Sequence, residues 1–206
     1  MIGEKKGSEH RLHLTAYTKR KVNKSFRYSA QFGVVGGDLT SAKQVGFGFD
    51  TRATYAFSNS DLKPQLMVGL AMGSEGFVQT GLHSNKTYDG GQTQFNRYGF
   101  VYQPQLANMT VLSVGAGIRP SRKLSVDLIA HLYAQSSLSN TSPTARVSGS
   151  VNGSSSYLGS EISLVGGWRP NKKTKIEFGA GLFKPGPAYN KRSPVKRIYF
   201  GISTYF

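Results

Sequence analysis

Apolar and polar residues alternate with a period of two along most of the chain. In residues 123–135, Leu124, Leu128 and Leu132 share one parity with smaller apolar residues, and Asp127 shares the other with Lys, Ser, His and Gln side chains. Successive side chains of a β-strand point to opposite faces. This segment is therefore predicted to be a strand with one apolar and one polar face.

The same division recurs in nine segments, and no charged residue falls on the apolar parity of any of them. The apolar sets, in chain order, are Leu12, Leu14 and Ala16; Phe26, Tyr28, Ala30, Phe32 and Val34; Val45, Phe47, Phe49, Ala53 and Tyr55; Leu66, Val68, Leu70 and Met72; Leu112, Val114, Ala116 and Ile118; Leu124, Val126, Leu128, Ala130, Leu132 and Ala134; Leu158, Ile162, Leu164 and Trp168; Ile176, Phe178, Ala180 and Leu182; Ile198, Phe200, Ile202 and Phe206. The opposite parity carries Arg11, Arg27, Asp50, Arg52, Asp127, Glu161, Lys175, Glu177 and Arg197.

An uncharged face on every strand is typical of a sheet that faces lipid. One Arg or Lys at the bilayer midplane costs a membrane barrel about 2–4 kcal/mol. We therefore expect an all-β fold, an antiparallel up-and-down transmembrane β-barrel of about nine strands over residues 1–206, or the C-terminal portion of a larger barrel. A soluble β-sandwich is the alternative, in which the apolar faces would meet each other. No apolar run reaches the roughly 18 residues that a membrane helix needs.

The connections alternate in length, as they do in outer-membrane barrels, which have short periplasmic turns and long outer loops. The short turns are predicted at 20–24, 58–63, 119–123 and 169–174, and the longer loops at 36–44, 74–108, 136–156 and 184–196. Residues 74–108 and 136–156 are thus expected to be long extracellular loops, with residues 1–9 as an N-terminal lead-in. The first of these loops contains four aromatic residues between Phe95 and Tyr102. Two structures remain open for it: an inward constriction or plug, and an ordered surface loop.

The N-terminus has no apolar stretch of the kind found in a secretory signal. Nine strands are also an odd number, whereas bacterial single-chain barrels have an even one. We therefore expect an upstream portion that this chain lacks. The alternative is a miscounted strand, at 97–103 or 145–151.

Positively charged residues outnumber negatively charged ones, with 26 Lys and Arg against 10 Asp and Glu, which gives a net charge of +16. Such an excess indicates an anionic partner: nucleic acid, anionic lipid or an acidic polymer. RNA-binding sheets place aromatic residues beside cations on one face. Here the large aromatic and aliphatic residues lie on the face without cations, so nucleic acid is not the expected partner.

Catalysis and metal binding find little support in the sequence. The chain has no cysteine, no Gly-x-Ser-x-Gly, no phosphate-binding loop and no metal-spaced cluster. Ser125 and His131 share a polar strand face, but six residues of strand span about 20 Å. We therefore expect that the protein is not an enzyme and that it has no catalytic residue, no bound metal and no cofactor.

Most of the chain, from about Val45 to Phe206, resembles the C-terminal half of the alginate export porin family. The segments that carry the resemblance are 53–57 (ATYAF), 69–76 (GLAMGSEG), 108–109 (NM), 116–120 (AGIRP), 124–128 (LSVDL), 167–170 (GWRP) and 198–206 (IYFGISTYF). The terminal strand also resembles the signal that the outer-membrane assembly machinery reads. The resemblance implies an outer-membrane location and the conduction of an acidic polysaccharide through a cation-lined lumen.

The function expected on these grounds is a pore for passive export of an anionic polysaccharide such as alginate. Lumen cations are predicted on the solute's path at Arg11, Arg27, Arg52, Lys175 and Arg197, and a cationic periplasmic mouth at Arg119, Arg122, Lys123, Arg169, Lys172 and Lys173. Two alternatives stay open, a general anion-preferring porin for small solutes and a non-conducting barrel that displays loops. The expected partners are outer-membrane lipid, the polysaccharide, the assembly machinery and periplasmic secretion proteins.

Overall fold

A computed structural model describes residues 10–39, 42–57, 59–77 and 91–204 of the chain. The described residues form nine strands: β1 (His10–Lys21), β2 (Phe26–Leu39), β3 (Ala42–Ala56), β4 (Gln65–Gly73), β5 (Met109–Ser121), β6 (Leu124–Ala134), β7 (Tyr157–Trp168), β8 (Thr174–Pro185) and β9 (Val195–Thr204). They contain no helix that is long and apolar enough to cross a membrane.

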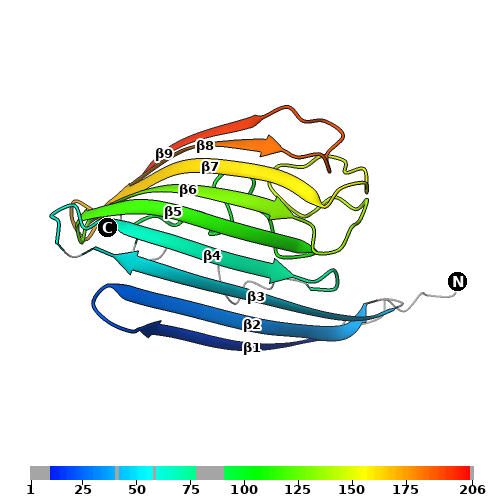
Figure 1. Ribbon diagram of the computed structural model, residues 1–206. Coiled ribbons are helices and arrows are strands. Elements are labelled where there is room, and N and C mark those ends of the chain that lie inside the picture. Colours follow the sequence, from blue (N-terminus) through cyan, green and yellow to red (C-terminus); the bar gives the residue numbers. More distant parts are fainter. Residues whose placement is uncertain (1–9, 40–41, 58, 78–90, 205–206) are drawn as a thin grey trace, which may run out of the picture.

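The strands form one antiparallel sheet in which each strand pairs with the next along the chain, from β1 to β9 (Figure 1). This order is the up-and-down topology that the sequence predicts. The sheet is twisted and curved, and its outermost strands β1 and β9 are not paired with each other within the described residues. The fold is therefore that of an antiparallel barrel wall that does not close.

The alternation seen in the sequence decides which side chains lie on each face of the sheet. Leu128 is 48% exposed, whereas its neighbours Asp127 and Ile129 are 6% and 1% exposed. Most of the large residues on the predicted apolar parity are exposed in the same way, among them Leu14, Leu66, Val114, Leu132, Ile162, Trp168 and Ile198. This outward apolar face is what a lipid-facing wall requires. Phe206 lies outside the described residues.

One residue of the predicted apolar set points the other way. Leu158 is fully buried on the inner side of the sheet. The pairing of β6 with β7 shifts by one residue here, because Tyr133 pairs with Gly159 and Ala134 with Tyr157. Gly159 has a φ of +136°, a backbone conformation that favours glycine. This β-bulge reverses the parity of the residues before it, so the outward position predicted for Leu158 is wrong.

The connections at one end of the sheet are short: 22–25, 57–64, 122–123 and 169–173. The connections at 74–108, 135–156 and 186–194 are longer and join the strands at the other end, where β1 begins, whereas β9 ends beside the short turns (Figure 1). The loop predicted at 36–44 is wrong, because β2 continues to Leu39 and β3 begins at Ala42. The extra strands considered at 97–103 and 145–151 are not among the nine.

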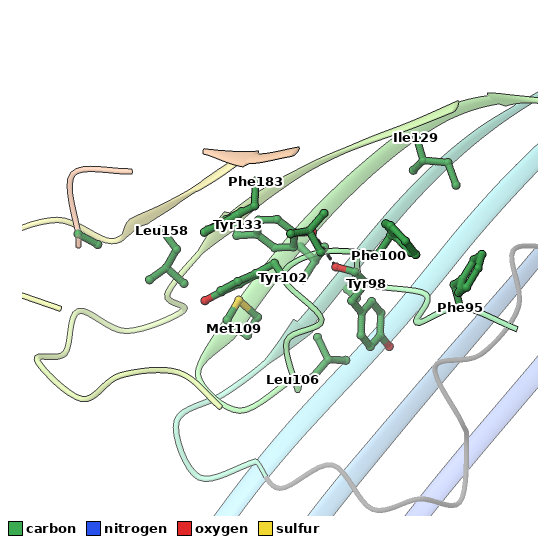
Figure 2. Packing of buried hydrophobic residues seen from close by; sticks show 14 of the residues in the cluster. Phe95, Tyr98, Phe100, Tyr102, Leu106, Met109, Ile129, Tyr133, Leu158 and Phe183 are labelled. Carbon is green, nitrogen blue, oxygen red and sulfur yellow. Dashed lines mark hydrogen bonds between the residues drawn. The ribbon is translucent and has the colours of Figure 1, made fainter. Parts of the chain in front are cut away.

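The long connection between β4 and β5 folds inward in its described second part. Phe95, Tyr98, Phe100 and Tyr102 are all buried, in a cluster with wall residues of β5–β8. In Figure 2 Tyr102 lies beside Tyr133 and Phe183 of the wall, whereas the ring of Tyr98 points away from these two residues. Of the two structures open for this loop, the inward one is observed for residues 91–108. Residues 78–90 lie outside the described part.

Candidate functional site

Residues 91–108, called the inner segment below, lie against the inner face of the sheet and determine which of its charged residues are accessible. The ring of Tyr102 stacks on that of Phe183 at 4.5 Å with an interplanar angle of 5°, and lies 4.7 Å from the ring of Tyr133. The Tyr133 hydroxyl donates to the Tyr98 carbonyl oxygen at 2.8 Å. The inner segment is therefore packed into the wall as a second layer.

Among the described carboxylates of the wall, Glu161 of β7 accepts the most hydrogen bonds from the inner segment. Its Oε1 accepts hydrogen bonds from the backbone N–H groups of Phe100 (2.6 Å) and Val101 (3.0 Å), and its Oε2 accepts one from Tyr102 (2.8 Å). The Ser163 hydroxyl donates to Oε1 at 2.6 Å. A carboxylate offers about four acceptor positions. Glu161, which is only 2% exposed, therefore has its acceptor capacity filled.

Asp50 of β3 contacts the opposite side of the inner segment. Its Oδ2 accepts from the Tyr98 hydroxyl at 2.8 Å and lies 3.3 Å from Nη1 of Arg97. Its Oδ1 lies 3.3 Å from Nε of Arg52, which is on the same strand. Burial, together with the charge of Asp50, raises the pKa of the Tyr98 hydroxyl, so this group remains a protonated donor.

Glu177 of β8 and Ser125 of β6 bind the start of the inner segment. The backbone N–H of Gln94 donates to Oε1 of Glu177 at 2.6 Å, and the N–H of Gln92 donates to the Ser125 hydroxyl at 2.7 Å. Strands β3, β6, β7 and β8 thus all provide acceptors for one segment.

The predicted lumen cations whose side chains are described lie on the inner parity. Lys175 is 4% exposed, and its Nζ is 2.9 Å from Oε1 of Glu177. Arg52 is buried, and its Nη2 donates to the Arg97 carbonyl oxygen at 3.2 Å. Arg27 is half-buried, with Nη2 3.4 Å from Oε1 of Gln65.

Arg197 is half-buried and in direct contact with the inner segment. Its guanidinium donates to the Phe100 carbonyl oxygen and lies 4.4 Å from the centre of the Phe100 ring. The side chain of Arg11 lies outside the described residues. The structure therefore brings Arg52 and Arg197 to the inner segment from β3 and β9, on opposite sides of it.

The predicted mouth residues fall into two environments. Arg119 is buried and paired with Asp127, at 2.7 Å between Nη2 and Oδ1. The other predicted mouth residues, at the short-turn end, are exposed: Arg122, Lys123, Arg169, Lys172 and Lys173. Lys123 reaches the Pro170 carbonyl oxygen at 3.0 Å, which links two neighbouring turns. Five of the six cations therefore form an exposed rim, and Arg119 belongs to the wall.

Sequence reasoning assigned no role to Ser113 and gave Glu161 only a place on the polar parity. Ser113 lies 2.9 Å from Nδ1 of His131, but both residues are buried away from solvent. No described group of three or more His, Asp or Glu side chains could hold a metal ion.

The alternation placed Glu161 on the inner face, but its three amide partners are about 60 residues away in the chain, and no local signal indicates them.

Comparison with known proteins gives a consistent assignment. The profile of a family described as "Alginate export" matches residues 3–203. The "Alginate production protein AlgE" of Pseudomonas aeruginosa is 25% identical over 177 residues, which cover 73% of this chain and 36% of the relative. The protein of the same name from Azotobacter vinelandii is 26% identical over 147 residues, which cover 60% of this chain and 30% of that relative.

The matches thus span about a third of the length of these two curated relatives. The family profile, in contrast, covers nearly all of this chain, and the nine-stranded up-and-down sheet with its apolar outer face agrees with the same assignment. The chain belongs to the alginate export family of outer-membrane β-barrel proteins.

Proposed function

We propose that this chain forms part of the wall of an outer-membrane pore through which an anionic polysaccharide such as alginate leaves the cell passively. The observation that carries the proposal is the family match together with the position of the cations. Arg27, Arg52, Lys175 and Arg197 lie on the inner parity of a sheet whose outer face is apolar. Guanidinium groups suit uronate carboxylates because they can form two parallel hydrogen bonds.

The exposed cations of the short-turn rim support a role in capturing the polymer. A field of one sign at the mouth of a pore can raise capture rates by about 10–10³-fold, and salt weakens it. In this proposal the rim concentrates the polyanion on the periplasmic side, and the inner cations give the path its preference for anions. The proposal is one of transport rather than catalysis. Periplasmic secretion proteins, and the assembly machinery acting on the C-terminal strand, are its proposed partners.

The test uses the full-length protein in planar lipid bilayers. Replacing Arg27, Arg52, Lys175 and Arg197 together by Gln should lower the anion-over-cation permeability ratio, which is read from the reversal potential in a KCl gradient. The matched control loses the same number of charges at four exposed positions at the other end of the sheet: Lys184, Lys191, Arg192 and Lys196. A quadruple inner variant with unchanged selectivity would remove these residues from the solute's path.

The packed inner segment is the observation that favours the two narrower alternatives, a small-anion porin and a non-conducting barrel. A barrel of about eight strands is filled by its own side chains, and polymer passage needs a wider lumen. Vesicles that contain the full-length protein separate the three functions. Release of trapped polyuronate supports export, release of small anions alone supports a porin, and release of neither supports a loop-displaying barrel.

A further inference from the structure

Three of the four described carboxylates on the inner parity of the wall are bound by the inner segment. Backbone N–H groups of the segment donate hydrogen bonds to Glu161 and Glu177. The Tyr98 hydroxyl donates a hydrogen bond to Asp50, and Arg97 forms an ion pair with it. The fourth, Asp127, is paired with Arg119 within the wall. Asp50 and Glu177 each have a wall cation as well, Arg52 and Lys175, whereas the donors to Glu161 are uncharged. Each inward carboxylate whose side chain the structure describes therefore has a hydrogen-bond donor on it.

We propose that the inner segment is a fixed layer that shields the wall carboxylates and thereby sets the anion preference of the pore. This inference rests on the proposed function, since it explains how a wall that carries acids as well as cations on its inner face can admit a polyanion. In this role Gln94, Phe100, Val101 and Tyr102 are positioning residues that act through their backbone amides. The solute then meets exposed polar side chains of the segment, such as Gln94 and Gln105, instead of the wall carboxylates.

The electrostatic reason lies in the short range of the amide contacts. A bare carboxylate in a narrow passage repels each uronate unit, and the repulsion grows as water is excluded. An amide N–H at 2.6–3.0 Å places a partial positive charge directly on the carboxylate oxygen. At Glu161 and Glu177 the shielding donors are uncharged backbone amides, and only Asp50 also has a guanidinium of the segment, that of Arg97, on it. The half-buried cations Arg27 and Arg197 then dominate the remaining field.

The packing indicates that the segment stays in place during transport. Phe100, Val101 and Tyr102 are at most 1% exposed, as are the wall residues Tyr133 and Phe183 that they meet. Glycines of β8 allow this close approach, because a Cβ at Gly179 would lie 2.6 Å from the Phe100 ring. Moving the segment would expose these aromatic side chains and leave Glu161 without its amide donors.

A charge-neutral substitution tests the shielding directly. Proline has no N–H, so Gln94→Pro removes the donor to Glu177 without changing any lumen charge. Gln94→Ala is the matched control, because it keeps the amide and changes only an exposed side chain. In the full-length protein in bilayers, we expect Gln94→Pro to lower the anion-over-cation permeability ratio about twofold at low salt. Equal ratios for the Pro and Ala variants would overturn the proposal.

A double variant sharpens the result. Glu177→Gln removes the carboxylate that the Gln94 amide shields and that pairs with Lys175. Glu177→Gln alone and Glu177→Gln added to Gln94→Pro should therefore give the same permeability ratio, at or above the unaltered value. A double variant that remains as cation-permeable as Gln94→Pro alone would contradict shielding, because the change would then come from general distortion of the segment.

Labelling tests whether the segment is fixed. The chain has no cysteine, so Val101→Cys provides a single buried thiol. We expect it to resist a charged thiol reagent with and without polyuronate, and to react once Glu161→Gln is added. Leu138→Cys, at an exposed loop position, is the reactive control. If Val101→Cys alone reacts only when polyuronate is present, the inner segment moves as a gate and is not a fixed layer.

These outcomes separate this inference from the proposed function. If the unaltered protein shows no anion preference and passes no polyuronate, the export proposal fails. The labelling of Val101→Cys would still report whether Glu161 holds the inner segment.

Discussion

Strands β1 and β6 expose their outer faces to a comparable extent and differ on their inner faces. Leu14 of β1 and Leu128 of β6 are 63% and 48% exposed. On the inner parity, Tyr17 of β1 is 53% exposed, whereas Ile129 and His131 of β6 are each 1% exposed. Strand alternation therefore sorts residues equally well in both regions, but among the described residues the contacts of the inner segment fall on strands from β3 to β9. One sheet thus combines a uniform lipid-facing surface with a two-part inner surface.

The largest effect is expected where the interior is packed. Phe183→Ala removes the ring that stacks on Tyr102 and should lower the free energy of unfolding by about 3–5 kcal/mol. Phe47→Ala on the outer face of β3 should cost much less, because this side chain is 45% exposed. Urea unfolding of the full-length protein in lipid vesicles, followed by far-UV circular dichroism, measures both. Equal losses would mean that the interior is not the main packed layer.

A charge on the outer face should cost nearly as much, and equally in both regions. Leu14→Arg and Leu128→Arg each place a guanidinium against lipid, which costs about 2–4 kcal/mol near the bilayer midplane. Gln31→Arg, on the inner face of β2, is the control and should have little effect. The same unfolding assay applies. If Leu14→Arg were harmless while Leu128→Arg was not, β1 would not face lipid.

Two glycines, Gly179 on the inner face of β8 and Gly36 on the outer face of β2, give the smallest expected contrast. A Cβ at Gly179 would lie 2.6 Å from the Phe100 ring, whereas a Cβ at Gly36 would meet nothing within 4 Å. Gly179→Ala should therefore cost about 1–3 kcal/mol through overpacking. Gly36→Ala should change stability by no more than about 0.5 kcal/mol. If Gly179→Ala does not lower the free energy of unfolding, the inner segment shifts easily and is not a fixed layer.

The sequence predicted the strands and their faces well because both follow from a local rule. Nine segments with a period of two became nine strands in consecutive order, and residues such as Leu128 and Ile162 face outward as expected. The rule failed at Leu158, where a bulge at Gly159 inserts one residue and reverses the parity. It also failed at 36–44, where β2 continues to Leu39 and β3 begins at Ala42.

The candidate site was only partly predictable. Alternation placed Arg52, Lys175 and Arg197 on the inner parity, where they lie, but it could not say that Arg52 and Lys175 would be buried. Their burial depends on what else occupies the inner face. For the connection between β4 and β5, the aromatic residues left an inward and a surface position equally open.

The sequence by itself determined the two faces of the wall, because the alternation of a strand is set by neighbouring residues and by the cost of charge in lipid. The tertiary structure alone decided what fills the inner face. The amides of Phe100, Val101 and Tyr102 meet Glu161 across about 60 residues of chain, and the Tyr98 hydroxyl meets Asp50 across 48. Contacts between residues so far apart depend on the curvature of the whole sheet, which brings β3, β7 and β8 around one segment.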